Sequence, residues 1–236
     1  MSGNLPLYFL SECVGCAVTL TVLASAGRMR RSALGVGLVM VIAAPLSVLH
    51  DGTYWTPERL LGGPFGVEDP MFAWRFTVLA MVAAFWPWRH GQNRCPADPL
   101  PGEVAVLTLV GALATVLLTY AADRSVMTAF LAAQATVAGI LLIRHPDLWR
   151  PALRAATIPS AIHALHLAVA VTFVPGFASM WQGSQPYWAT FAGIPIEEVL
   201  WAATFGACVP LMWAVATGWR PEKAPSITVA GAPSPD

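Results

Sequence analysis

The sequence predicts an all-α integral membrane protein with about seven transmembrane helices. Of its 236 residues, 56% are hydrophobic and only 11% are charged, whereas a soluble domain carries about 25% charged residues. The apolar residues form continuous runs, each close to the roughly 20 residues that a helix needs to cross a bilayer. Continuous runs also favour helices over membrane-spanning strands, in which apolar and polar residues alternate.

Each expected helix corresponds to one apolar run. The runs cover about 6–26, 33–50, 68–88, 103–122, 126–143, 154–174 and 194–217. We expect residues 1–217 to form a single transmembrane domain, followed at 218–236 by a disordered tail that contains proline and serine. A retinal protein is excluded, because its Schiff base needs a lysine in the last helix and Lys223 lies in the tail.

The basic residues predict the orientation of the helices. Ten of them lie in or beside the first, third and fifth connections or in the tail, and only two lie in the other connections. By the positive-inside rule, the N-terminus is outside the cell membrane and the tail is cytoplasmic. The net charge of zero gives no indication of a nucleic-acid partner, so the expected surroundings are the lipid bilayer.

Two acidic pairs stand at equivalent places in the chain. Glu68-Asp69 opens the third predicted helix and Glu197-Glu198 opens the seventh, each after a turn that contains glycine and proline. Acidic residues also suit helix N-termini for purely structural reasons. Two pairs in matching contexts nevertheless indicate an internal repeat.

The repeat predicts the arrangement of the helices. Helices 1–3 (about 6–88) and helices 5–7 (about 126–217) would be parallel three-helix repeats, joined by a connector helix at 103–122. Parallel repeats about an axis along the membrane normal are a known membrane architecture. Both acidic pairs would then lie at one depth, on the outer side.

The residues around these pairs resemble the lycopene cyclase domain of heterodimeric bacterial carotenoid cyclases and of fungal fused enzymes. Pro195-Ile-Glu197-Glu198 matches the Pro-x-Glu-Glu motif of that family, and Trp55-Thr-Pro-Glu-Arg-Leu-Leu-Gly62 resembles the segment before it. Gly66 stands where the first repeat should have the proline. The resemblance implies cyclisation of lycopene end groups in carotenoid biosynthesis. Fungal membrane-bound meroterpenoid cyclases, which act on a prenylated small molecule, are similar in size and in their use of acidic residues.

Cyclisation of a polyene without loss of diphosphate begins with protonation of an alkene or epoxide in a dry pocket. Adjacent carboxyls can supply both the acid and the final base, because like charges at close range keep one of them protonated. The candidate catalytic residues are therefore Glu68, Asp69, Glu197 and Glu198. Asp69 is also typical of an ordinary helix N-cap, because Pro70 follows it.

Other polar and aromatic residues fall at the same predicted depth. The supporting candidates are Glu12, His50, Asp51, Arg75, His163 and His166. Ionisable residues inside a membrane are functional candidates by default, although Arg75 could simply pair with Glu12 or Glu68. The spacing of the last two histidines would suit a metal, but we expect them to bind the glutamates and expect no metal or cofactor. Phe72 and Trp201, one turn after the acidic pairs, could stabilise a carbocation.

Two other functions stay open at this point. A proton-coupled transporter could also use acidic pairs at helix starts, and the chain could be a subunit that needs partner biosynthetic enzymes. The Asp-rich motif that holds magnesium diphosphate is absent from the sequence, which argues against prenyl transfer. Cys13-x-x-Cys16 could be a redox pair, but the sequence has no second pair to relay electrons.

Overall fold

Helices that can cross a membrane form most of the structure, a computed structural model that describes residues 6–49, 51, 53–89, 97–122, 124–181 and 189–221. Within these ranges, six helices are long and apolar enough for a membrane span. The chain is therefore a mostly helical, multi-pass membrane protein. Most of the predicted tail lies outside the described residues.

The six long helices follow the predicted apolar runs closely. They are α1 (Leu7–Ala24), α3 (Glu68–Phe85), α4 (Pro101–Tyr120), α5 (Val126–Arg144), α6 (Trp149–Phe173) and α7 (Ile196–Thr217). The shorter elements are α2 (Met29–Val41), the 3-10 helices η1 (Ala44–Leu49), η2 (Trp86–Trp88), η3 (Pro146–Leu148) and η4 (Phe177–Trp181), and the strands β1 (Thr190–Phe191) and β2 (Ile194–Pro195). The two strands form an antiparallel hairpin directly before α7.

The second predicted helix, 33–50, is wrong in its extent. The α-helix here begins earlier, ends at Val41, and is followed by η1. Pro45 explains the break, because it has no amide hydrogen to donate to the carbonyl oxygen of Val41, four residues earlier. With 13 residues, α2 alone covers only about 20 Å at about 1.5 Å per residue.

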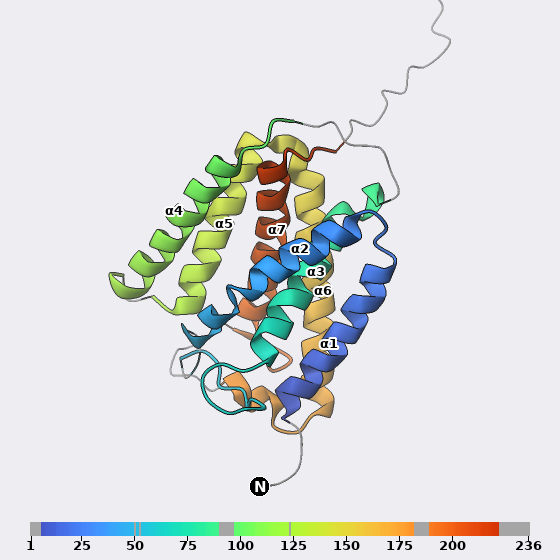
Figure 1. The fold of residues 1–236 in the computed structure, drawn as a ribbon. Coiled ribbons are helices and arrows are strands. Elements are labelled where there is room, and N and C mark those ends of the chain that lie inside the picture. Colours follow the sequence, from blue (N-terminus) through green and yellow to red (C-terminus); the bar gives the residue numbers. More distant parts are fainter. Residues whose placement is uncertain are drawn as a thin grey trace, which may run out of the picture.

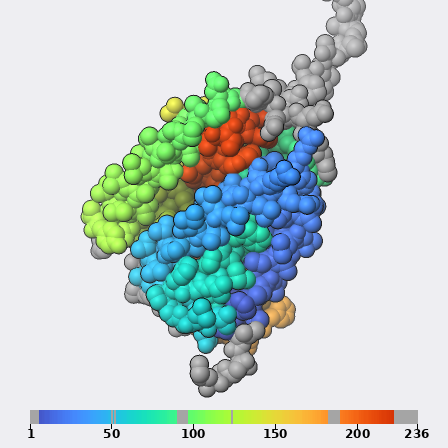
Figure 2. Space-filling view, viewed as in Figure 1, coloured from blue at the N-terminus to red at the C-terminus, as the bar shows by residue number. Residues whose placement is uncertain are grey.

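The helices α3 and α7 form the centre of the bundle (Figure 1). The first packs against α1, α2, α6 and α7, and the second packs against α3, α4, α5 and α6. The helix α4 lies at the side, against α5 and α7. Figure 2 shows α7 reaching the surface between α4 and α2.

The two ends of the bundle differ in their elements (Figure 1). One end, which we call the acidic end, holds the starts of α1, α3 and α7 together with η1 and η4. The other, which we call the basic end, holds the α1–α2 connection, η2, η3 and the end of α7. Its described basic residues include Arg28, Arg30, Arg31, Arg89, Arg150 and Arg220.

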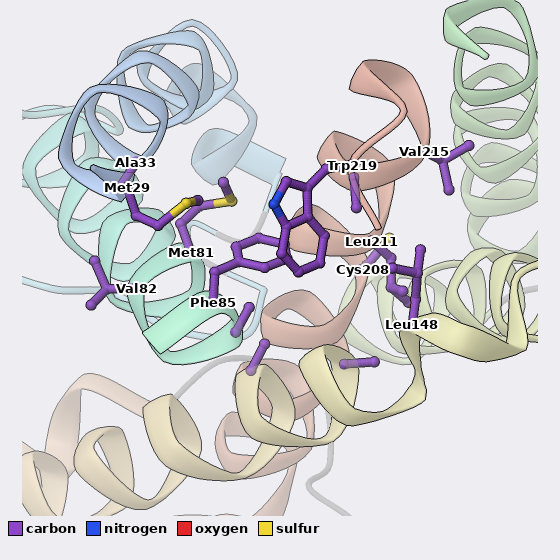
Figure 3. Close-up of a cluster of buried hydrophobic side chains, with 14 of the residues drawn as sticks. Met29, Ala33, Met81, Val82, Phe85, Leu148, Cys208, Leu211, Val215 and Trp219 are labelled. Carbon is purple, nitrogen blue, oxygen red and sulfur yellow. The ribbon is translucent and has the colours of Figure 1, made fainter. Parts of the chain in front are cut away.

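A packed apolar core joins α2, α3 and α7 at the basic end (Figure 3). The ring centroids of Phe85 and Trp219 are 4.4 Å apart, and Met81 and Leu211 are buried in the same cluster. Trp219 reaches this core because α7 ends at Gly218, whose φ of 69° lets the chain turn back. Close packing holds such helices together in lipid, which is itself apolar. The core therefore fixes α3 against α7, and with them the relative positions of the two acidic helix starts.

Gly206 allows α6 and α7 to approach closely, and this contact gives a first prediction. A Cβ atom at this position would collide with the backbone carbonyl oxygen of Ala155. We expect Gly206→Ala to lower the free energy of unfolding by about 1–3 kcal/mol, measured by detergent-induced unfolding. Gly139→Ala is the matched control, because nothing lies within 4 Å of the added atom; it should stabilise α5 by about 0.5–1 kcal/mol. Equal stability of the two variants would contradict the prediction.

Candidate active site

A cavity of about 260 Å³ lies at the acidic end. Its wall includes residues of α1, η1, α3, α5, α6, η4 and α7, most of them apolar or aromatic. Among the described lining residues, the acidic groups are Glu12, Asp69 and Glu198. An apolar cavity with a few convergent polar groups is the usual form of a small-molecule site, so we take this cavity as the candidate active site.

Glu12 of α1 forms a buried ion pair with Arg75 of α3. The Nε atom of Arg75 lies 2.5 Å from Oε2 of Glu12, and its Nη2 atom lies 2.8 Å from Oε1. The two side chains are only 4% and 2% exposed. Gly15 makes room for this pair, because a Cβ there would lie 2.6 Å from Nε of Arg75. Arg75 thus pairs with Glu12, one of the two partners considered from the sequence.

Asp69 accepts hydrogen bonds from the loop that precedes α3. Its Oδ2 atom accepts hydrogen bonds from Nε of Arg59, at 3.0 Å, and from the amide of Gly66, at 2.8 Å. Arg59 also donates to Oδ1 of Asp51, at 2.7 Å. Burial works against the charge of Arg59, but the hydrogen bonds and charges of the two aspartates raise its pKa overall. Asp51 and Asp69 therefore both face a permanent cation.

Glu68 and Glu197, the first members of the two acidic pairs, are not among the described residues that line the cavity. Both are buried, with exposed fractions of 0% and 2%. Oε1 of Glu68 accepts a hydrogen bond from the amide of Leu60 at 2.6 Å. This contact ties the loop before α3 to the start of the helix.

Glu198 faces the cavity with different partners. Its Oε1 atom accepts a hydrogen bond from Nε1 of Trp181 at 3.0 Å, and its Oε2 atom lies 3.4 Å from Nε2 of His163. The side chain is 12% exposed. In the part of the chain that the structure describes, no arginine or lysine forms an ion pair with it. Glu198 is thus the cavity carboxyl whose charge no guanidinium balances.

One sequence difference accounts for the different partners of Asp69 and Glu198. Gly66 and Pro195 occupy matching positions before the two acidic pairs. The amide of Gly66 donates to Asp69, whereas a proline has no amide hydrogen. Pro195 therefore cannot hold Glu198 in the same way, and the departure from the proline motif at Gly66 has a structural reason.

Aromatic rings from α3 and α7 meet on the cavity wall. The ring centroids of Phe72 and Trp201 are 5.3 Å apart with an interplanar angle of 28°. Phe205 extends the stack, 5.0 Å from Trp201. The imidazole of His163 lies 5.9 Å from the ring of Phe72. The wall thus holds a stack of aromatic rings next to the His163–Glu198 pair.

The remaining predicted site residues are placed as follows. His166 of α6 also lines the cavity, and its Nε2 atom lies 2.5 Å from Oγ of Ser11. His50 lies outside the described residues. Among those that are described, no group of three or more His, Cys, Asp or Glu side chains could hold a metal ion. Asp51 contacts Arg59 and is not on the described cavity wall.

Several residues of the site were not predicted from the sequence: Tyr8, Ser11, Arg59 and Trp181 line the cavity or contact its polar groups. Arg59 carried a usable signal, because it is one of only two basic residues in the connections predicted to lie outside. A basic residue on the side of the membrane where basic residues are scarce indicates an anionic partner nearby. Trp181 carried no such signal, because it lies in a connection without periodicity.

The arrangement suits acid chemistry on an apolar ligand. It combines one carboxyl that pairs with no arginine or lysine among the described residues, an adjacent imidazole and stacked aromatic rings in a mostly apolar cavity. Comparisons with models of protein families, with curated protein sequences and with solved structures found no match. The function is therefore inferred from these residues.

Proposed function

We propose that the protein is an integral-membrane terpenoid cyclase, which starts ring closure of an isoprenoid polyene by protonating it. The observation that carries this proposal is the difference among the three cavity carboxyls. Glu12 and Asp69 are paired with arginines, whereas the hydrogen bonds of Glu198 among the described residues are with a histidine and an indole. Glu198 is therefore the group that can hold a proton and deliver it.

The reaction would proceed in three balanced steps. The O–H bond of Glu198 breaks as a C–H bond forms on the terminal alkene, which leaves a carbocation. A second alkene attacks this carbon and closes the ring with a new C–C bond. A neighbouring C–H bond then loses its proton to the Glu198–His163 pair, and an alkene forms again. The product is an isomer of the substrate, with no net oxidation or reduction.

The cavity wall fits the charge that develops in this reaction. Phe72, Trp201 and Phe205 place a stack of aromatic rings on this wall, and cation–π attraction to this stack would stabilise the carbocation. The Glu12–Arg75 ion pair carries no net charge as a unit, so it adds none to this wall. The cavity volume of about 260 Å³ lies just below the roughly 300–1,000 Å³ that enclose a drug-sized ligand. It therefore suits one end of a long polyene better than a whole one.

Two separate arguments bear on the substrate class, one from the sequence motif and one from the polar groups of the cavity. The Pro-x-Glu-Glu motif at Pro195 makes a lycopene end group the first candidate by resemblance, and a role in carotenoid biosynthesis would follow. A prenylated small molecule is the second candidate, because the cavity also contains polar groups away from Glu198.

We further propose that the helices form two parallel three-helix repeats joined by α4, with seven membrane crossings. The contacts support this: α3 packs on α1 and α2, as α7 packs on α5 and α6. The second crossing would combine α2 with the 6 residues of η1, which adds about 12 Å at about 2 Å per residue. The arginines of the basic end favour a cytoplasmic location for that end, with the N-terminus outside.

Turnover in heavy water tests the proposed chemistry. Detergent-solubilised protein would be given lycopene, or a prenylated phenol, in D2O without any ion gradient. We expect a cyclised product that carries one deuteron from the solvent, because the acid exchanges its proton with water and one substrate proton is lost. A transporter would give no product under these conditions. Product that appears only after a second biosynthetic protein is added would instead support a partner-dependent subunit.

A further inference from the structure

Several polar atoms of cavity-lining residues lack a hydrogen-bond partner in the part of the chain that the structure describes, among them Oγ of Ser47 and Nδ1 of His163. Two more belong to the starts of α1 and α3, namely Oη of Tyr8 and Oδ1 of Asp69. The residues are only 4% and 3% exposed. The other oxygen of Asp69 is already bound to Arg59 and to the amide of Gly66. Buried polar atoms are nearly always hydrogen-bonded in proteins. The two unpartnered atoms of Tyr8 and Asp69 on one cavity wall therefore indicate that a ligand supplies their hydrogen-bond partners.

The two atoms complement each other chemically. A carboxylate oxygen only accepts hydrogen bonds, whereas a phenol hydroxyl both donates and accepts. Tyr8, Glu12 and Asp69 line the same cavity, and Glu12 already binds Arg75 through both oxygens. A ligand hydroxyl could donate to Oδ1 of Asp69 and accept from the hydroxyl of Tyr8, so that one group satisfies both atoms.

We infer that the cavity binds an isoprenoid that carries a hydroxyl group, and that Tyr8 and Asp69 form the subsite for this hydroxyl. The polyene part then extends toward Glu198, which lines the same cavity. A pure hydrocarbon would leave both polar atoms without a partner. This inference rests on the proposed function for the isoprenoid itself, and it favours a prenylated alcohol or phenol over lycopene.

Competition binding tests the subsite. The Glu198→Gln protein, in which turnover of the ligand should be greatly slowed, would be placed in lipid nanodiscs with tritiated farnesol. Unlabelled farnesol and farnesene, a hydrocarbon with the same isoprenoid chain, would compete at equal mole fractions in the lipid. A site that is built to bind a hydroxyl rejects the analogue without one, so we expect farnesol to compete at least about tenfold better.

Tyr8→Phe, made in the same background, should reduce this preference to about threefold or less. Tyr120→Phe is the matched control, because Tyr120 is 76% exposed at the end of α4 and should keep the full preference. Equal competition by farnesol and farnesene would overturn the inference, as would a Tyr8→Phe variant that keeps the preference.

Thermal unfolding without ligand separates binding from structure. Tyr8→Phe should leave the unfolding temperature unchanged, because the hydroxyl makes no hydrogen bond within the described protein. A marked drop would mean that the hydroxyl has an internal partner, and it would overturn the subsite. A protein that prefers farnesol but cyclises no substrate would keep the subsite and refute the cyclase, so the two failures can be told apart.

Discussion

Replacement of Glu198 with glutamine is expected to slow cyclisation by about 10²–10⁴-fold, the usual contribution of a general acid. The amide keeps the size of the side chain, and its oxygen can still accept the hydrogen bond that Trp181 donates at 3.0 Å. It cannot give up a proton to an alkene. The rate should be measured as product formed per protein, with the unfolding temperature recorded alongside to show that the fold is kept.

Glu197→Gln is the matched control for this experiment. Glu197 is the neighbouring member of the same motif and is buried at 2% exposure, but it is not among the described residues that line the cavity. Its replacement should leave the chemical step within about tenfold of the wild type. If the Glu197 variant lost the activity and the Glu198 variant kept it, the proton donor would have to be reassigned to Glu197.

Replacement of Arg75 with methionine is expected to destabilise the protein by about 3–5 kcal/mol, because it leaves a buried charge without its partner. Glu12, at 2% exposure, would keep its carboxylate in the apolar interior with no cation to balance it. Methionine has a similar length and fits apolar surroundings. The free energy of unfolding should be followed by circular dichroism while sodium dodecyl sulfate is titrated into mild detergent.

Two further variants show whether the buried charge is the cause. Glu12→Gln combined with Arg75→Met removes both charges and should recover most of the lost stability. Arg144→Met breaks an ion pair with Glu103 in which the arginine is 61% exposed, and it should cost at most about 1 kcal/mol. Equal losses for Arg75→Met and Arg144→Met would contradict the role given to burial.

The sequence predicted the helices because hydrophobicity alone determines which segments can enter a membrane. Six apolar runs became long helices with nearly the predicted bounds. The prediction for the second run was wrong because a count of apolar residues does not register Pro45, which interrupts the backbone hydrogen bonds. A reading of the proline position would have corrected this helix.

The site could be predicted only in part, for a physical reason. Asp69 and Glu198 open the third and the seventh predicted helices, which cross the membrane in the same direction. This was enough to expect both residues at one end of the bundle, and both line the cavity. Their partners could not be expected in the same way, because Arg59 and Trp181 come from connections whose conformation follows no period. These partners distinguish an anchored carboxylate from one that can donate a proton.

The difference between Gly66 and Pro195, at matching positions of the two proposed repeats, has an evolutionary consequence. On the proposed repeat, the two halves descend from one duplicated unit that began with the same acidic helix start in both copies. A backbone amide at one position binds the acid of the first copy, and its absence at the matching proline leaves the acid of the second copy available. On the proposed function, a single residue of this kind would be enough for one copy to specialise in holding the protein together while the other specialises in chemistry.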